Sequence, residues 1–327
     1  MSICGRTKSH KGSCFFLFVI GFDSFLAVLA GAKDRLCAAP VALFGVHWRP
    51  CDRVLCTVPA FCFLMHLPPL PPLIEADLAR VNELMRQRLN TDVALIAFAA
   101  QMLVHSQASR PRPALVMVVG RALGGDAERL RMLAGAVEFI HTSLQLHHEL
   151  DGAPSEDAAP RAFGGNASHV LLGDLLYTGA FRLLVDLGDM RVLRLLSDAT
   201  NVIAEGSVMY QQALAGPGLD WAACRRILQA RSATLFEAGA RCAALLCGAD
   251  AAIEESLALY GRHLGMAHQW AVEARMGAGA LVLPAQGEAL AAQVAQDLAA
   301  ARAALPELAD AELRAALLAW AAPRAQA

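Results

Sequence analysis

The chain has 327 residues, of which 56% are hydrophobic and 18% are charged, and its formal net charge is −2. An apolar fraction this high excludes intrinsic disorder, which requires few apolar and many charged residues. The near-neutral balance gives no basic footprint, so a nucleic-acid partner is not expected. The length suits one large domain or two ordinary ones.

The composition of the chain changes near Met65. Six of the nine cysteines and all of the lysines precede it, the latter being Lys8, Lys11 and Lys33. Residues 14–32 are apolar apart from Asp23 and Ser24, follow basic residues and end in small ones. This order is typical of a secretory signal peptide. The run is about long enough to cross a bilayer, although a central carboxylate disfavours insertion.

Three interpretations of residues 1–64 stay open: a membrane anchor or signal, a small cysteine-containing appendage, or a stretch upstream of a true start at Met65. We favour the third. The cysteines in this segment lack the paired CxxC spacing of zinc sites, so zinc is not expected. Residues 65–327 would then be the working domain and cytoplasmic, whereas a membrane location or export follows if residues 1–64 are real.

From Met65 onward the sequence predicts helices nearly throughout. Within residues 74–89, apolar side chains recur at helical spacing, with charged residues on the opposite face. Further helical runs are predicted over residues 91–106, 112–123, 126–150, 167–187, 190–213, 220–247, 250–275, 286–304 and 310–321. Gly124, Gly188 and Gly248 mark helix ends. Because no alternating strand pattern of useful length occurs, we expect an all-α fold.

The segment from Glu138 to Gly152 concentrates three histidines and three acidic residues. It is not an HExxH zinc motif, because the residue four positions after His148 is Gly152. His147 and Asp151 share a helix face, whereas Glu149 points away from it. A metal would find at most two good ligands, and an exposed polar helix end is the simpler interpretation.

Several blocks of this sequence, in order, resemble the all-trans polyprenyl diphosphate synthases, most closely those of the octaprenyl type: FIHTSLQLHHELD, RAFGGNASHVLLGDLLYTGAF, NVIAEGSVM, RSATLFEAGARC and YGRHLGMAHQ. The resemblance covers roughly residues 75–285. It implies an isoprenoid-synthase-type bundle of about ten or more helices around a deep central cavity. It also implies condensation of isopentenyl diphosphate with an allylic diphosphate, with Mg²⁺ held by two DDxxD motifs.

Both metal-binding motifs of that family are altered in this chain. The first corresponds to His148–Gly152, where histidine and glycine replace the end aspartates and Asp151 is out of phase by one residue. The second corresponds to Val272–Met276, where Arg275 adds the wrong charge. Since Mg²⁺ prefers hard oxygen ligands in octahedral geometry, neither motif is a convincing site. The remnant ligands would be His148, Glu149, Asp151 and Glu273.

The substrate-binding half is better retained, although the family's GKRxRP block has lost its lysine and the arginine pair after the first metal motif is missing. The resemblance implies substrate-binding roles for Arg110, Arg112, His141, Arg231, Ser232 and Gln269. Purely structural roles stay open for some of these: a core amide for Gln269, a surface cation for Arg231 and a packing residue for His141. Ser143 matches a position where small side chains suit long products.

These patterns lead to three functional hypotheses. The first is a catalytically impaired synthase homologue without a cofactor, which acts as a non-catalytic partner subunit or binds isopentenyl or allylic diphosphate. It would form a homodimer, or a heterodimer with an active prenyl synthase. The second is an active long-chain prenyltransferase that uses Mg²⁺ at an altered site made of the remnant ligands. The third is a helical protein that binds an apolar ligand or has a structural role.

Overall fold

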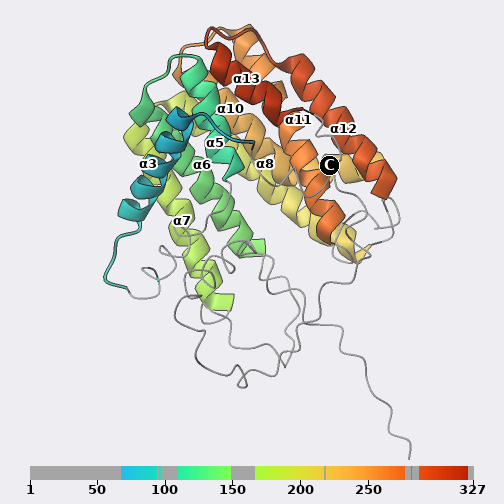
Figure 1. Cartoon of the computed structure of the whole chain (residues 1–327). Helices are drawn as coiled ribbons and strands as arrows, with labels where there is room; N and C mark the ends of the chain where they lie inside the picture. The colour runs from blue at the N-terminus through green and yellow to red at the C-terminus, as the bar shows by residue number, and fades with distance from the viewer. Residues whose placement is uncertain are drawn as a thin grey trace, which may run out of the picture.

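The computed structural model describes residues 68–93, 96, 110–148, 166–216, 219–276, 281 and 287–322. In these ranges the chain forms helices packed into a bundle (Figure 1), which confirms the all-α prediction. None of the helices described is both long and apolar enough to cross a bilayer. Residues 1–64 and most of the predicted helix over 91–106 lie outside these ranges.

The first half of the bundle is built around α6 (Ala127–His148), which packs against α3 (Pro72–Arg88), α5 (Pro111–Ala122) and α7 (Asn166–Leu187). Helix α5 is apolar from Pro113 to Gly120, and every residue from Ala114 to Val119 is fully buried. A helix of this kind belongs in the centre of a bundle. Its first turn is therefore held firmly by neighbours on every side.

The second half contains α8 (Met190–Ala215), α9 (Trp221–Leu228), the π-helical turn η2 (Gln229–Ala233) and α10 (Thr234–Leu246). The helical run predicted over 220–247 is observed over Trp221–Leu246, but the π-turn η2 within it was not predicted. Helices α8 and α11 both pack against η2. A π-turn inserts an extra residue into a helix and often marks a functional site.

The C-terminal part of the chain packs on α10 through α11 (Ala251–Met276), and α12 (Gly287–Ala304) packs on α11 in turn. Helix α13 (Ala311–Trp320) contacts α5. The hydroxyl of Tyr260 in α11 donates to the carbonyl of Leu317 in α13, at 2.7 Å. This bond fixes α13 across the bundle.

Local sequence explains where several helices begin and end. Asp189, Asp220 and Asp310 accept hydrogen bonds from backbone N–H groups in the first turns of α8, α9 and α13. At the other end, Gly124 and Gly248 follow α5 and α10 with φ near +70°, at +73° and +70°. Glycine adopts this left-handed conformation without strain, and it closes a helix. The predicted glycine stops at these positions are confirmed.

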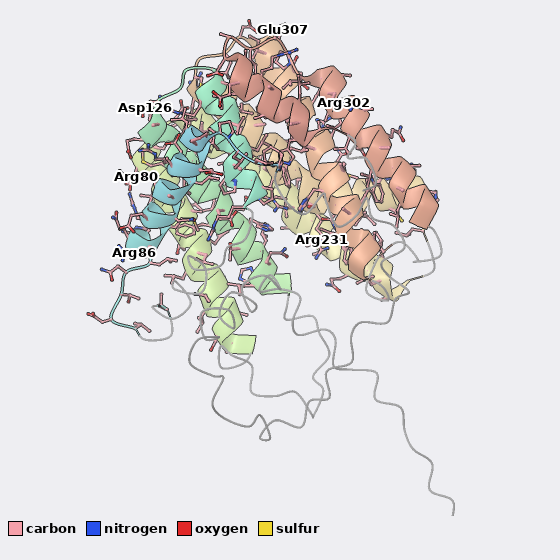
Figure 2. The ribbon with its side chains drawn as sticks, in the orientation of Figure 1. Arg80, Arg86, Asp126, Arg231, Arg302 and Glu307 are labelled. Atoms are coloured by element: carbon pink, nitrogen blue, oxygen red, sulfur yellow. The ribbon has the colours of Figure 1, made fainter. Side chains whose placement is uncertain are left out.

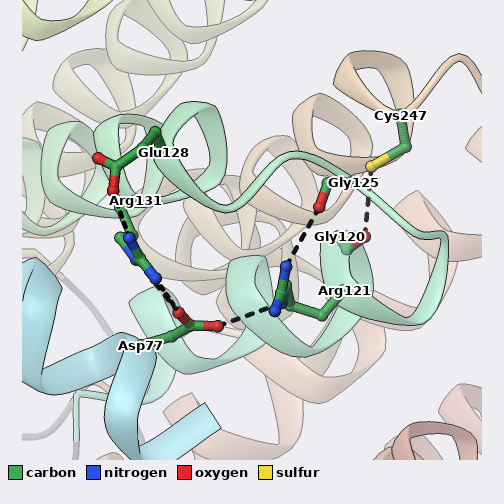
Figure 3. A network of polar contacts seen from close by, with 7 residues as sticks. All are labelled: Asp77, Gly120, Arg121, Gly125, Glu128, Arg131 and Cys247. Atoms are coloured by element: carbon green, nitrogen blue, oxygen red, sulfur yellow. Dashed lines mark hydrogen bonds and ion pairs between the residues drawn. The ribbon is translucent and has the colours of Figure 1, made fainter. Parts of the chain in front are cut away.

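A buried carboxylate ties α3, α5 and α6 together, as Figure 3 shows. Asp77 is 2% exposed and pairs with Arg131 at 2.6 Å and with Arg121 at 3.2 Å. Next to this network, the thiol of Cys247 donates to the carbonyl of Gly120 at 3.4 Å. Asp77, Arg121 and Arg131 therefore have a structural role, which is to hold α3, α5 and α6 together.

Candidate functional site

Arg112, in the first turn of α5, is the centre of the candidate site. Its guanidinium donates to His141 Nε2 at 3.1 Å and to the hydroxyl of Ser232 at 3.4 Å. It also lies 4.5 Å from the centre of the Phe236 ring. Because a guanidinium has no acceptor, Nε2 of His141 must be the acceptor in this contact. The structure therefore brings together three of the predicted substrate-binding residues, from α5, α6 and η2.

The charge of Arg112 is not neutralised by any carboxylate ion pair among the described residues. Burial lowers the pKa of Arg112 to about 10, and the charge of Glu138 acts in the opposite direction. The Nε atom of Arg112 is buried without a hydrogen-bond partner in the described part of the chain. A buried cation without a direct ion pair is costly, and a phosphate group could supply one through paired N–H···O bonds.

Arg110 is engaged differently, although it lies only two residues away. It precedes α5 with φ at +28°, a conformation that residues with side chains rarely adopt, and its side chain is buried. Its guanidinium donates to the carboxylate of Glu138 at 3.0 Å. Sequence reasoning did not assign Glu138 a role. The available signal was its position three residues before His141, on the same face of α6.

A second polar cluster surrounds Arg231 and connects α8, η2 and α11. The guanidinium of Arg231 lies 4.0 Å from the centre of the Tyr210 ring, and the Tyr210 hydroxyl is 3.5 Å from Glu273 Oε1. Gln269 Nε2 donates to the same oxygen at 3.0 Å. Burial raises the pKa of Tyr210, which therefore keeps its proton and can donate. Tyr210 was not predicted from the sequence.

The two clusters meet in the π-turn, because Arg231 and Ser232 are consecutive residues of η2. Glycines of the neighbouring helices allow this close packing. A Cβ atom on Gly206 of α8 would lie 2.7 Å from the backbone nitrogen of Arg231. A Cβ on Gly265 of α11 would lie 2.9 Å from the Cα of Ala233. Figure 2 shows Arg231 far from Glu307, in the half of the bundle where α6 and α11 end.

Of the predicted metal remnants, only the side chain of Glu273 lies within the described residues. His148 ends α6, and its side chain, like all of Glu149 and Asp151, lies outside them. Glu273 is 1% exposed, and its other oxygen accepts the backbone N–H of Leu281 at 2.8 Å. Burial raises the pKa of Glu273, and its hydrogen bonds oppose that rise. In the part of the chain described, no three His, Cys, Asp or Glu residues are grouped to hold a metal.

Magnesium is a poor fit for Glu273 as the structure places it. Mg²⁺ usually keeps several of its waters and needs room for six oxygen ligands. A carboxylate that is 1% exposed and already accepts hydrogen bonds from Gln269, Tyr210 and Leu281 has little room for a hydrated cation. In this arrangement Glu273 stabilises protein groups.

Among known proteins, the chain is similar in sequence to prenyl diphosphate synthases. Octaprenyl diphosphate synthase of Escherichia coli is 35% identical over 248 residues, which is 75% of each chain. The all-trans-nonaprenyl-diphosphate synthase (geranyl-diphosphate specific) of Rhodobacter capsulatus is 29% identical over 200 residues, covering 60% of this chain and 61% of the relative.

Solved structures show the same similarity. A polyprenyl synthase from Caulobacter crescentus, complexed with calcium and isoprenyl diphosphate, superposes with a TM-score of 0.64 at 32% identity, over 76% of this chain and 94% of the other. A decaprenyl diphosphate synthase from Rhodobacter capsulatus gives a TM-score of 0.65 at 26% identity, over 76% and 95%. The family model for polyprenyl synthetase matches residues 93–271. From this match and the identity to the octaprenyl enzyme, the chain belongs to the polyprenyl synthetase family and has the isoprenoid-synthase fold.

Proposed function

We propose that this protein binds an isoprenoid diphosphate through Arg112, His141 and Ser232 and turns it over poorly or not at all. The observation that supports this proposal is the buried guanidinium of Arg112, which has no carboxylate ion pair among the described residues. Its fork of donors suits the oxygens of a diphosphate. Arg110 pairs with Glu138, so we assign it the supporting role of shaping the start of α5.

The impairment follows from the metal half of the site. The family normally uses Mg²⁺ to stabilise the departing diphosphate, and this stabilisation is worth several kcal/mol. Here the first motif lacks its end aspartates, and Val272 and Arg275 occupy positions of the second. Glu273 is the carboxylate left there, and three protein donors occupy it. We therefore expect the protein to bind isoprenoid diphosphates but to catalyse their condensation poorly or not at all.

Binding of isopentenyl diphosphate to the full chain, measured by isothermal titration calorimetry, tests this proposal. Replacing Arg112 with Met keeps the bulk of the side chain but removes its charged hydrogen bonds, so affinity should fall by about 10- to 100-fold. Arg129→Met, which removes a half-exposed cation at the start of α6, is the matched control and should change nothing. Failure of the wild-type protein to bind would contradict the proposal and favour a structural or apolar-ligand role.

A partner subunit is the second part of the proposal. Helices α7 and α8 carry large apolar side chains on their outer faces: Leu171 is 69% exposed, Val185 65%, Met190 72% and Val208 59%. Exposed apolar residues of this size, repeated along two helices, are typical of a protein–protein contact. We propose that an active prenyl synthase covers this face and supplies the metal half of catalysis.

Co-purification with an active prenyl synthase tests the heterodimer. Leu171→Glu and Met190→Glu should each weaken it, whereas Val93→Glu, at a residue 54% exposed outside α7 and α8, should not. Self-association of the isolated chain with the same sensitivity would identify a homodimer instead. A monomer that captures no synthase would contradict the partner role.

The alternative function is an active long-chain prenyltransferase. Its support is the 35% identity to an octaprenyl diphosphate synthase and the small, fully buried Ser143 on α6. Incubation with isopentenyl diphosphate, farnesyl diphosphate and Mg²⁺ decides between the two. Long-chain product that disappears in Glu149→Ala and Asp151→Ala proteins would establish the alternative and overturn impairment.

For domain organisation, we propose that the working protein comprises residues 65–327 and acts in the cytoplasm. The support is the change in composition at Met65 together with the family match, which starts at residue 93. Mass spectrometry of the protein from its native cells tests this, since a peptide from residues 35–60 would contradict it.

A further inference from the structure

Glu273 occupies a position where the family resemblance implies a metal ligand, yet its contacts in this chain are all with protein donors. We propose that Glu273 is a positioning residue that takes the place of the metal: it fixes Leu281 and Tyr210, and through Tyr210 it orients Arg231 toward a diphosphate. The consequence is that diphosphate binding does not require a divalent cation. The orientation of Arg231 and this consequence rest on the proposed binding function, whereas the contacts of Glu273 with Leu281 and Tyr210 do not.

The hydrogen bonds around Glu273 join three separate segments. Oε2 accepts the backbone N–H of Leu281, which follows α11, at 2.8 Å. Oε1 is shared by Gln269, one turn earlier on α11 at 3.0 Å, and by the hydroxyl of Tyr210 on α8 at 3.5 Å. Glu273 is 1% exposed and Tyr210 2%. A buried carboxylate needs such donors, since an unpaired one is very costly.

A metal ion at Glu273 would compete with these contacts for the carboxylate oxygens. Metal sites on a helix use acceptors one turn apart, because residues four positions apart lie on the same face. The residue one turn before Glu273 is Gln269, and its amide group donates to the carboxylate rather than facing a cation. Ligation through Oε2 would weaken its hydrogen bond with the Leu281 N–H, because the metal would withdraw charge from that oxygen. Positive charge near this carboxylate comes instead from Arg231, whose electrostatic attraction lowers the Glu273 pKa in opposition to burial.

The effect reaches Arg231 through the aromatic ring of Tyr210. The guanidinium of Arg231 lies 4.0 Å from the ring centre, and a cation held over an aromatic face gains from the ring's quadrupole. The hydroxyl of that ring is held by Glu273. Arg231 adjoins Ser232, whose hydroxyl accepts a hydrogen bond from Arg112, so both cations are anchored at the π-turn. Two arginines then supply positive charge that the family normally derives partly from metal.

The first test measures metal binding and the Leu281 contact, and it needs no substrate. Mn²⁺ titration of the full chain, followed by electron paramagnetic resonance, should give the same result for wild type and Glu273→Gln. The backbone amide of Leu281 should exchange with deuterium slowly in wild type and faster in Glu273→Ala. A Mn²⁺ site that Glu273→Gln abolishes, or fast exchange of this amide in wild type, would overturn the positioning role.

The second test measures affinity for farnesyl diphosphate, an allylic substrate, with Mg²⁺ and with EDTA. Wild-type affinity should be the same in both, and Glu273→Gln should weaken it by about threefold to tenfold. In an Arg231→Met background the same substitution should have no further effect, since Glu273 acts through Arg231. Glu254→Gln is the matched control, on the same helix about 28 Å away and paired with Arg241, and should bind like wild type.

The outcomes separate the two proposals. Wild-type binding that EDTA abolishes would refute metal independence and leave diphosphate binding intact. Additive effects of Glu273→Gln and Arg231→Met would refute the positioning of Arg231. No binding under any condition would refute the proposed function, and the Mn²⁺ and exchange measurements would still decide the role of Glu273.

Discussion

Asp297 is the residue whose removal should most clearly destabilise the C-terminal half of the bundle. It lies on α12, is 1% exposed and receives hydrogen bonds from two other helices. Arg225 of α9 donates to it at 2.9 Å. From α11, His263 Nδ1 lies at 2.9 Å and the indole N–H of Trp270 donates at 3.0 Å. One carboxylate thus joins three helices.

The expected loss in the free energy of unfolding depends on whether each donor can find another partner once Asp297 is removed. The Trp270 side chain is fully buried, so its N–H would be left without a partner, at a cost of about 1–3 kcal/mol. The Arg225 side chain is 31% exposed and can turn to water, so its share is at most about 1 kcal/mol. With the lost packing of the side chain, these contributions bring the expected cost of Asp297→Ala to about 2–5 kcal/mol. Asp297→Asn keeps one acceptor and should cost about 1–2 kcal/mol.

Urea denaturation followed by tryptophan fluorescence measures these losses. The midpoint should fall while the slope of the transition stays constant, which indicates a change in stability alone. Asp198→Asn is the matched control, because Asp198 pairs with Arg194 on the surface of α8, where their side chains are 68% and 81% exposed. That substitution should change the free energy of unfolding by less than about 0.5 kcal/mol.

The pH dependence gives a second check on the same residue. Burial alone would raise the pKa of Asp297, but the bonds from His263, Arg225 and Trp270 outweigh it and the pKa is lowered. Its stabilisation is therefore present above the unfolded-state pKa of about 3.9 and lost as the pH falls through the folded-state value. The difference between wild type and Asp297→Asn should shrink below about pH 4. A constant difference, or a loss under about 1 kcal/mol for Asp297→Ala, would refute the reasoning.

Three further predictions concern packing. Gly206→Ala should lower the free energy of unfolding by about 1–3 kcal/mol, because the new Cβ would lie 2.7 Å from a backbone nitrogen of η2; a stability equal to wild type in urea would contradict this. Tyr260→Phe should cost about 1 kcal/mol, since it removes the 2.7 Å hydrogen bond to the Leu317 carbonyl, which keeps its bond from the Ala321 N–H, and a thermal melt measures this. Cys242 should resist iodoacetamide until the protein unfolds, because it is fully buried and burial raises the pKa of its thiol. The half-buried Cys247 should react first, and mass spectrometry of the alkylated peptides would reveal the opposite order.

The helices could be predicted from the sequence because their determinants are local. Helical spacing of apolar residues, aspartates at helix starts and glycines at helix ends all act within one or two turns. The π-turn η2 could not be predicted in this way. Its cause is the approach of α8 and α11, made possible by Gly206 and Gly265, which are 23 or more residues from the turn's first residue along the chain. A single run of helix-forming residues therefore predicts one helix where the fold contains three elements.

For the site, the family resemblance pointed to Arg112, His141 and Ser232, and the structure places them in contact. Whether they bind substrate is still a prediction. The resemblance did not point to Tyr210 or Phe236, because aromatic rings at helical spacing are usually core residues and nothing local distinguishes these two. Their role depends on which cation lies over each ring, and this is set by how α5, α8 and η2 pack.

Glu273 shows why a matched position does not by itself predict chemistry. Sequence reasoning could identify it as the carboxylate left between Val272 and Arg275, but not whether its oxygens are free. They are occupied by a backbone N–H eight residues later and by a hydroxyl 63 residues earlier, partners that only the tertiary fold brings within reach. Once neighbouring metal ligands are replaced, a buried carboxylate must find other donors or be lost, because burial of an unpaired charge is too costly. If Glu273 has the positioning role proposed above, substitution of the metal motif and the hydrogen bonds to Leu281 and Tyr210 form one coupled change.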